Sequence, residues 1–488
     1  MQSLTPKLNK NSRFYAYVLF FSVIFFLTGL LFGQLAGNVR LVMGAFIFMF
    51  LTALAFFDMK KVLWTILFFL PVVVGLNNYQ INIGTLFQNI VNAGDLYVNP
   101  FSLTCLFLIF LAIIEILRVG KKMAKIPLFF ILLISAALSI TVLLPSKYLA
   151  IGLIFEVYLL AGFSAYFLGY LFLSSKENFL KTILVIIFSA VIPALTGTFQ
   201  LLTGNYFFEN DSSLGRIAAT FPHPNTFGSF LFIVLTLFLV TFFAVSLENR
   251  RTNLSKLGIY FFAFILGLLF ILTYSRTAWS GLLISALAIF IMKPRVRTLM
   301  VYCGLLLSSI VLLFDKTRER ILGIFEHHMY DSMYGRYEIW DMALFKAWKK
   351  PFIGYGIGSF SEIIKDTQGK ETGNVYPHND LVRFFLEGGV LGILLYLIYL
   401  IGALYYASKS FLRYPKVNEK LHFWGKDFNV ELKTLGVVPL VLFGSMIIIS
   451  MVESPSMDFT YQIISWLLLG SWLGVSQKHW RKNNKQLN

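Results

Sequence analysis

Four arginines stand in short polar segments between long apolar runs. They are Arg216 in "GRIAATFPHPNTFGSF", Arg276 in "TYSRTAWSG", Arg336 in "GRYEIW" and Arg383 in "YPHNDLVRFF". An arginine between apolar helices is costly unless it faces a cavity or a partner. Guanidinium groups stay charged and bind phosphate with two parallel hydrogen bonds, so several of them on one face predict a phosphate or pyrophosphate ligand. The alternative to ligand binding is a side chain that extends along the apolar surface to place its guanidinium among lipid headgroups. This alternative applies to Arg276, and more strongly to Arg383.

One histidine accompanies these arginines in a position suited to proton transfer. Histidine is the side chain whose ordinary pKa suits acid–base work near neutrality. His378 follows Pro377 and precedes Asn379 at the expected start of a helix, where the positive end of the backbone dipole favours the neutral imidazole. A neutral imidazole can act as a base. The alternative is a histidine that only makes hydrogen bonds at a helix end.

Three carboxyl groups are candidates for a supporting role. Glu156 lies about nine residues into the apolar run 148–173, and an intramembrane carboxylate usually has a partner. We expect it to orient an arginine, or to couple protons if the protein is a transporter. Glu453 and Asp458, in "MVESPSMDFT", lie in the turn between the last two apolar runs and could orient an arginine or a histidine. No cysteine or H-x-x-x-H pattern accompanies them, so no metal site is expected.

The composition indicates which elements must position these residues. The chain has 488 residues, of which 57% are hydrophobic and only 13% are charged, too few charges to cover a water-soluble surface of that size. We therefore expect an all-α integral membrane protein, a single polytopic domain over 1–488 with about 12–14 transmembrane helices. The apolar runs lie near 14–36, 39–57, 62–76, 100–118, 126–144, 148–173, 179–202, 224–246, 257–273, 278–292, 298–314, 384–408, 436–452 and 460–475.

The placement of lysine and arginine predicts the orientation, because cytoplasmic loops retain positive charge during insertion. With the N-terminus inside, most basic residues fall in inner loops, including a cluster from Lys409 to Lys433. Both termini are then cytoplasmic, and 14–36 is a retained first helix. The net charge of +17 is mostly a topology signal, so we expect no nucleic-acid partner.

The loops differ in size, and the large ones fall outside. The inner connections are too short for a nucleotide-binding domain, and no GxxxxGK[ST] motif is present, so no cofactor is expected. The largest extracytoplasmic loop, 315–380, contains "GRYEIWDMALFKAWKKP", whose apolar residues, including Ala343, Ala347 and Trp348, recur at helical spacing. This helix either packs over the bundle or lies among headgroups. The following "PFIGYGIGSF" predicts a tight turn that brings backbone close to another segment, with no helix plainly after it.

Two segments together resemble a known family. "GRYEIWDMALFKAWKKPFIGYGIGSF", followed by "YPHNDLVRFFLEGGVLGILLYL", is similar to the signature region of the O-antigen ligase and polymerase superfamily. The shared pattern is an arginine before a tryptophan helix, a "P-x-x-G-x-G" turn, "H-N", and an "E-x-G-x-x-G"-like helix start. Upstream, Arg216 with "HPN" at 223–225, and "YSRTAW", resemble further elements of the family.

The resemblance implies a glycosyltransferase of the GT-C type that needs no metal and uses undecaprenyl-pyrophosphate-linked glycans outside the cytoplasmic membrane. In that scheme Arg216 and Arg276 hold the donor pyrophosphate, Arg336 assists, and His378 deprotonates the acceptor hydroxyl for an inverting attack. Glu453 or Asp458 fills the place of the family's acidic residue near the last outer turn. Asn379 and Arg383 are further candidates for substrate contact.

Within this class we favour a polymerase of a surface polysaccharide, such as an exopolysaccharide, a capsule or a teichuronic-acid-like polymer. A ligase that transfers the glycan to another acceptor is the first alternative. Pathway partners would be membrane lipid, a flippase and a chain-length regulator. From another class, the protein could itself be a flippase or transporter, but such proteins commonly show paired halves with interrupted helices, and no internal repeat is visible.

Overall fold

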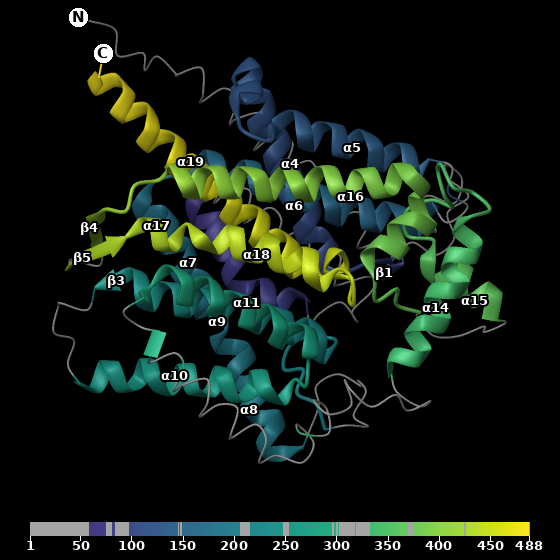
Figure 1. Cartoon of the computed structure of the whole chain (residues 1–488), viewed down its shortest axis with the longest axis horizontal. Helices are drawn as coiled ribbons and strands as arrows, with labels where there is room; N and C mark the ends of the chain where they lie inside the picture. The colour runs from purple at the N-terminus through teal and green to yellow at the C-terminus, as the bar shows by residue number, and fades with distance from the viewer. Residues whose placement is uncertain are drawn as a thin grey trace, which may run out of the picture.

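The protein is an all-α, multi-pass membrane protein, as the composition predicts (Figure 1). Six segments are long and apolar enough to cross a membrane, and three helices are shorter and apolar, among the residues that the computed structural model describes. The runs at 14–36 and 39–57, and nearly all of 298–314, lie outside those residues. The described residues are 58–74, 81–82, 97–144, 146, 149–204, 215–246, 253–294, 297–298, 301, 318, 332–368, 375–423 and 426–487.

Most expected apolar runs form helices close to their predicted bounds. After an unlabelled helix over 58–73, the helices of the first half are α4 (Pro100–Val119), η2 (Gly120–Lys125), α5 (Phe129–Leu143), α6 (Leu149–Phe172), α7 (Lys176–Ser189), α8 (Val191–Thr203), α9 (Pro224–Ala244), α10 (Asn253–Leu272) and α11 (Arg276–Met292). Those of the second half are α14 (Ser332–Ala347), α15 (Phe360–Gln368), α16 (Asp380–Arg413), α17 (Leu432–Leu435), α18 (Val437–Ile449), η5 (Pro455–Met457) and α19 (Phe459–Leu487). The predicted run 179–202 is divided at Ala190 between α7 and α8.

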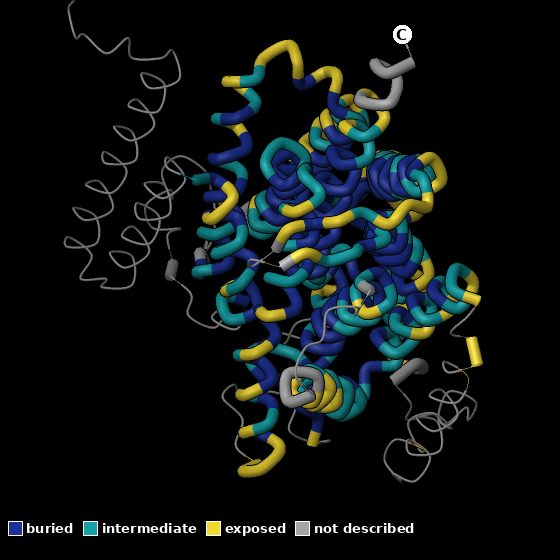
Figure 2. Tube along the Cα trace, turned by 90° about the vertical axis from the view of Figure 1, so that its left-hand side faces the viewer, coloured by how far each residue is buried: buried dark blue, intermediate teal, exposed yellow. Residues whose placement is uncertain are grey.

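The centre of the bundle is an aromatic core. Trp466 of α19 packs edge-on against Phe163 and Tyr166 of α6, with ring centroids 5.5 Å and 6.1 Å apart. Edge-to-face packing of this kind adds to the free energy gained from burial. Figure 2 shows the buried residues concentrated inside the bundle, with exposed residues along its outer surfaces. The helices that carry polar residues at their ends are therefore held by a rigid, well-packed interior.

Helix α16 is broken at Gly389, and a loop fills the break. Gly389 has φ 57°, and the helix resumes at Val390. The Val390 N–H donates to the Pro351 carbonyl at 2.8 Å. On the other side of the break, the Gly356 N–H donates to the Glu387 carbonyl at 2.7 Å. A Cβ on Gly389 would lie 2.5 Å from the Phe352 carbonyl carbon. The glycine-containing turn therefore satisfies backbone groups that a broken helix would otherwise leave unpaired.

The predicted close approach of this turn to another segment is thus observed, but a helix does follow it. α15 begins at Phe360, and its apolar face packs on α14: Ala343, Ala347 and Ile364 are fully buried there. Of the two alternatives for α14, packing on other helices is therefore correct for the side that carries Ala343 and Ala347, which also meets Leu386 of α16. Trp348, expected on the packed side, follows the last residue of α14 and is 70% exposed, although the edge of its ring meets Phe385 of α16 with centroids 5.2 Å apart.

Loops assigned to the same side of the membrane by their charges meet at the same end of the bundle. The connection 409–435, predicted to be an inner one, contains strands β4 (Asn418–Phe423) and β5 (Lys426–Glu431), which the sequence analysis did not predict. β5 also pairs with β3 (Val245–Ser246), after α9. This three-stranded antiparallel sheet lies at the opposite end of the bundle from α14 and α15 (Figure 1). A second, two-stranded sheet joins β1 (Ile81–Asn82) and β2 (Tyr97–Val98).

Candidate active site

The candidate site forms where the segment before α16 meets the turn between α18 and α19. Asn379 caps α16 by accepting from the Val382 N–H at 3.1 Å, and its side-chain amide donates to the Met451 carbonyl at 3.1 Å. The Asp380 N–H donates to the Ser450 carbonyl at 2.8 Å. These bonds hold the turn 450–456 directly against the residue that precedes the cap, His378.

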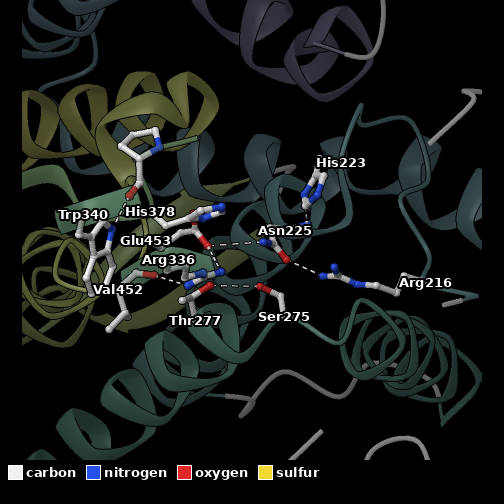
Figure 3. Close-up of polar contacts among 11 residues, drawn as sticks. Arg216, His223, Asn225, Ser275, Thr277, Arg336, Trp340, His378, Val452 and Glu453 are labelled. Carbon is white, nitrogen blue, oxygen red and sulfur yellow. Dashed lines mark hydrogen bonds and ion pairs between the residues drawn. The ribbon is translucent and has the colours of Figure 1, made fainter. Parts of the chain in front are cut away.

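His378 contacts the carboxyl group of Glu453. The Nδ1 atom of the histidine lies 2.7 Å from Oε1 of the carboxylate (Figure 3), and the side chains are 25% and 20% exposed. When Nδ1 carries the proton and donates to the carboxylate, the lone pair of a neutral imidazole is on Nε2. A carboxylate that fixes the tautomer and ring orientation in this way is a recurring partner of a catalytic histidine.

The backbone around His378 is held from a second direction by α14. The indole Nε1–H of Trp340 donates to the carbonyl of Pro377 at 2.7 Å. His378 itself has φ 49°, a left-handed conformation that costs energy in a non-glycine residue. The contacts on both sides of the histidine offset that cost, and they give the side chain one direction.

Arg336 joins the same carboxylate from α14. Its guanidinium lies 3.5 Å from Oε2 of Glu453 and donates to the Val452 carbonyl at 2.6 Å. The distance to Glu453 exceeds the length of a short charge-assisted hydrogen bond, about 2.7–2.9 Å. The guanidinium is therefore anchored more firmly by the backbone of the turn than by the carboxylate, and an anion could compete with Glu453 for it.

Arg216 reaches the cluster through Asn225. Its guanidinium donates to the Asn225 side-chain oxygen at 2.5 Å (Figure 3) and to the Thr273 carbonyl at 2.8 Å. The amide nitrogen of Asn225 lies 3.5 Å from Oε2 of Glu453. Asn225 stands in the first turn of α9, where Nδ1 of the cap residue His223 accepts from its N–H at 3.1 Å. Residues from three segments that are far apart in the sequence thus converge on one carboxylate.

Arg276 begins α11, next to the segment that holds Arg216. The Ile217 N–H donates to the Leu272 carbonyl at 3.1 Å, which joins the chain before α9 to the end of α10. Arg276 is partly buried and lies between Ser275 and Thr277, whose hydroxyl oxygens are 3.2 Å apart. Arg276 therefore lies at the same end of the bundle as Arg216, where the sequence analysis expects it.

Arg383 and Asp380 form a buried network on the inner side of the same turn. Arg383, only 3% exposed, donates to Glu387 at 3.1 Å and to the Ser456 hydroxyl at 2.9 Å. The Asp380 carboxyl accepts from that hydroxyl at 2.5 Å and from the Ser456 N–H at 3.1 Å. This geometry gives Arg383 a place in the scaffold beneath the site, away from the position expected of a ligand-binding arginine.

Glu156 lies apart from the arginines. Its Oε1 accepts from the Ser139 hydroxyl of α5 at 2.8 Å, and its Oε2 is buried without a hydrogen-bond partner. Among the described residues no arginine pairs with it, in contrast to the expected salt bridge. The side chain is nonetheless only 5% exposed.

The two acids of the last turn differ in their electrostatics. Burial alone would raise the pKa of Glu453, but the hydrogen bond and charge of His378, with the charge of Arg336, lower it below the ordinary glutamate value. For Asp458, burial dominates and raises the pKa to about 7, against hydrogen bonds that include the Tyr461 N–H. Glu453 is therefore the permanently ionised member of the pair at neutral pH.

Several residues of the site were not singled out from the sequence. Asn225 connects Arg216 to Glu453, Ser456 connects Asp380 to Arg383, and Trp340 holds Pro377. The exposed Tyr376 ring lies 6.2 Å from the His378 ring, centroid to centroid. Asn225 stands in the quoted "HPN" motif, which was the only sequence signal for it; a serine in a short turn gives none.

The described residues define an all-α membrane protein in which a histidine, a carboxylate and arginines form a cluster at one end of the bundle. The O-antigen ligase family model matches residues 261–397, which include Arg276, Arg336 and His378. A "ComP-specific O-oligosaccharyltransferase" of Acinetobacter baylyi is 26% identical over 196 residues, 38% of this chain. The match spans about a third, 34%, of that relative. Both matches confirm the resemblance to the O-antigen ligase and polymerase superfamily.

Proposed function

We propose that the protein transfers a glycan from an undecaprenyl-pyrophosphate-linked donor to a sugar hydroxyl, as the polymerase of a bacterial cell-surface polysaccharide. The observation that carries the proposal is the contact of His378 with Glu453, which also lies 3.5 Å from Arg336. His378 and Arg336 fall in the region 261–397 matched by the O-antigen ligase family, and Glu453 follows it. The end of the bundle that holds this site would face the outside of the cytoplasmic membrane, with both termini inside.

In the proposed reaction, Nε2 of His378 removes the proton from the acceptor hydroxyl as its oxygen attacks the anomeric carbon of the donor sugar. The bond between that carbon and the pyrophosphate oxygen breaks, and the lipid pyrophosphate leaves with the electron pair. Attack from the opposite face inverts the configuration. Glu453 stabilises the imidazolium that forms, as buried carboxylates do for catalytic histidines.

The arginines have the complementary task. Negative charge grows on the pyrophosphate as the bond breaks, and preorganised guanidinium groups stabilise it more than they stabilise the ground state. Arg336 lies 3.5 Å from Glu453. Arg216 is connected to Glu453 through the side chain of Asn225, and Arg276 begins the neighbouring helix α11. In this scheme the chemistry needs neither a metal ion nor a nucleotide, because the leaving group is already activated.

A ligase is the second candidate. The name of the matched relative describes an oligosaccharyltransferase, which moves a glycan onto a different acceptor. Both reactions use the same donor and the same base, and they differ in the group that supplies the hydroxyl. The acceptor must therefore be identified by experiment.

The first experiment measures polymer length in a deletion strain of the source organism that carries His378→Ala. We expect single lipid-linked repeats to accumulate while the protein reaches the membrane at the normal level. The matched control is His422→Ala, because His422 also pairs with a carboxylate, Asp427 at 3.0 Å, but is 71% exposed at the other end of the bundle. Long polymer from the His378→Ala strain would contradict the proposed base.

A second measurement distinguishes a polymerase from a ligase and from a flippase. The purified protein in detergent, given lipid-linked repeats alone, should lengthen them if it is a polymerase. Transfer only after a different acceptor is added would identify a ligase. A flippase would give no product in either case, since detergent removes the membrane across which it acts.

A further inference from the structure

The end of α14 and the turn after it carry an exposed apolar edge. We define this edge as Phe345, Trp348, Phe352 and Ile353, which are 65%, 70%, 73% and 44% exposed. The opposite side of the same segment is buried, with Ala343 and Ala347 at 0%. Aromatic side chains gathered on one exposed surface usually mark a contact with a partner or a membrane.

The edge is continuous with the lipid-facing surface of α16. The Leu391 N–H donates to the Phe352 carbonyl at 3.2 Å, so the turn is fixed where the second half of the helix begins. From that point α16 exposes one apolar face, at a spacing of three or four residues: Val390 (44%), Leu394 (43%), Leu397 (36%) and Ile401 (57%). In a membrane-spanning helix such a face contacts lipid. The edge therefore extends the lipid-contacting surface toward its end.

The charges around the edge match the polar layer of a membrane. Lys349 and Lys350 are exposed beside it, and their ammonium groups lie 4.6 Å from the ring centroids of Phe345 and Tyr355. Tryptophan and lysine together are typical of the depth where headgroups meet hydrocarbon, because the rings contact the acyl chains while the ammonium groups contact phosphate.

We infer that the edge lies in the headgroup layer of one membrane leaflet and anchors α14 there. A protein partner or a second copy would also cover apolar rings, but neither accounts for the continuity with the α16 face or for the flanking lysines. The lipid contact concerns the edge alone and stands without the proposed reaction.

The anchor would also fix the depth of the site residues on α14, and this consequence rests on the proposed function. The same helix carries Arg336 and Trp340, which hold the Glu453 turn and the Pro377 carbonyl. A lipid-linked pyrophosphate lies at headgroup depth, so an anchored α14 would keep these residues at the level of the donor phosphates.

The test places an environment-sensitive fluorophore at Phe352→Cys, after Cys105 and Cys303 are replaced, with one protein per lipid nanodisc. Two matched positions bracket it: Thr367→Cys, exposed on α15 of the same loop, and Ile401→Cys, further along the exposed face of α16. The fluorescence of each label is measured with iodide in the aqueous phase as the quencher. It is then measured with lipids that carry a spin label at the headgroup, at a shallow acyl position or at a deep acyl position.

We expect iodide to quench the label at Phe352 several-fold less than at Thr367, and headgroup or shallow labels to quench it most. Ile401, about 15 Å along the helix from Leu391, should respond most to the deep label. Iodide quenching at Phe352 equal to that at Thr367 would overturn the inference. Protection from both iodide and lipid labels would also overturn it, because it would show a protein covering. Each variant is first checked for a single symmetric peak in gel filtration, and Trp348→Cys provides a second reading of the same edge.

Discussion

Nδ1 of His378 and Oε1 of Glu453 lie 2.7 Å apart, although 75 residues separate them in the chain. The histidine precedes α16 and the glutamate follows α18, so packing of the two helix ends creates the pair. Its geometry is that of a base with an orienting carboxylate.

Glu453→Gln should reduce the transfer rate while leaving donor binding nearly unchanged. The amide can still accept a hydrogen bond from Nδ1–H, but it cannot stabilise the imidazolium, and the loss of acid–base assistance is worth about 10²–10⁴-fold in general. The measurement is the pH profile of the rate constant and KM with purified protein. A KM change alone, with the pH profile unmoved, would show that Glu453 serves binding through Arg336.

Arg336→Lys should raise the KM for the lipid-linked donor and lower the rate constant. Lysine keeps the charge but lacks the planar pair of donors that suits phosphate. Arg216→Lys should act in the same direction. Arg118→Lys is the matched control, since Arg118 pairs with Glu115 at 2.5 Å near the C-terminal end of α4. Equal effects of all three substitutions would point to general destabilisation.

Ser456→Ala should destabilise the turn that carries Glu453. The change leaves Asp380 and Arg383 without a buried hydroxyl between them, and an unsatisfied buried group costs about 1–3 kcal/mol. The thermal midpoint in detergent should fall, and Ser456→Thr should restore it. An unchanged midpoint for the alanine variant would show that water replaces the hydroxyl.

Gly389→Ala should be strongly destabilising. The residue has φ 57°, and its Cβ would lie 2.5 Å from the Phe352 carbonyl carbon. With ψ −145° the backbone lies in a region that is populated almost only by glycine, and such strain costs about 1–3 kcal/mol for a residue with a side chain. Gly258→Ala in α10 is the control, because open space surrounds that position and alanine favours a helix. Similar thermal midpoints for the two variants would contradict the broken-helix geometry.

Asp458→Asn should raise stability at alkaline pH and change it little at acid pH. The folded pKa is about 7, above the unfolded value of 3.8. The folded state therefore binds the proton more tightly, and the wild-type protein loses stability as pH rises between these values, by about 1.4 kcal/mol for each pKa unit. Asparagine removes that dependence. The check is the thermal midpoint at pH 5 and pH 8; parallel shifts at both would contradict it.

The all-α membrane fold could be predicted because apolar runs of helical length leave few other structures in a bilayer. The grouping of the loops also followed from charge. The predicted inner end of the apolar run 224–246 pairs, at 245–246, with the predicted inner segment 426–431, and the predicted outer residues Arg336, His378 and Glu453 meet. β4 and β5 were missed because they are short and highly charged, with few of the β-branched residues typical of strands, although they pair with each other as neighbours in the chain; only the third strand, β3, is distant. α15 was missed because glycines precede it and only nine residues form it.

The sequence by itself determined which residue types were available for chemistry and on which end of the bundle they would gather. Apolar length and positive charge act locally along the chain, so they can be read from it. Only the tertiary structure decided that Glu453 is the shared partner of His378 and Arg336, that Arg383 is buried against Ser456, and that a glycine turn fills the break in α16. These contacts join residues that are distant in sequence or depend on a local break in helical geometry, and their partners are selected by the packing of whole helices rather than by spacing along the chain.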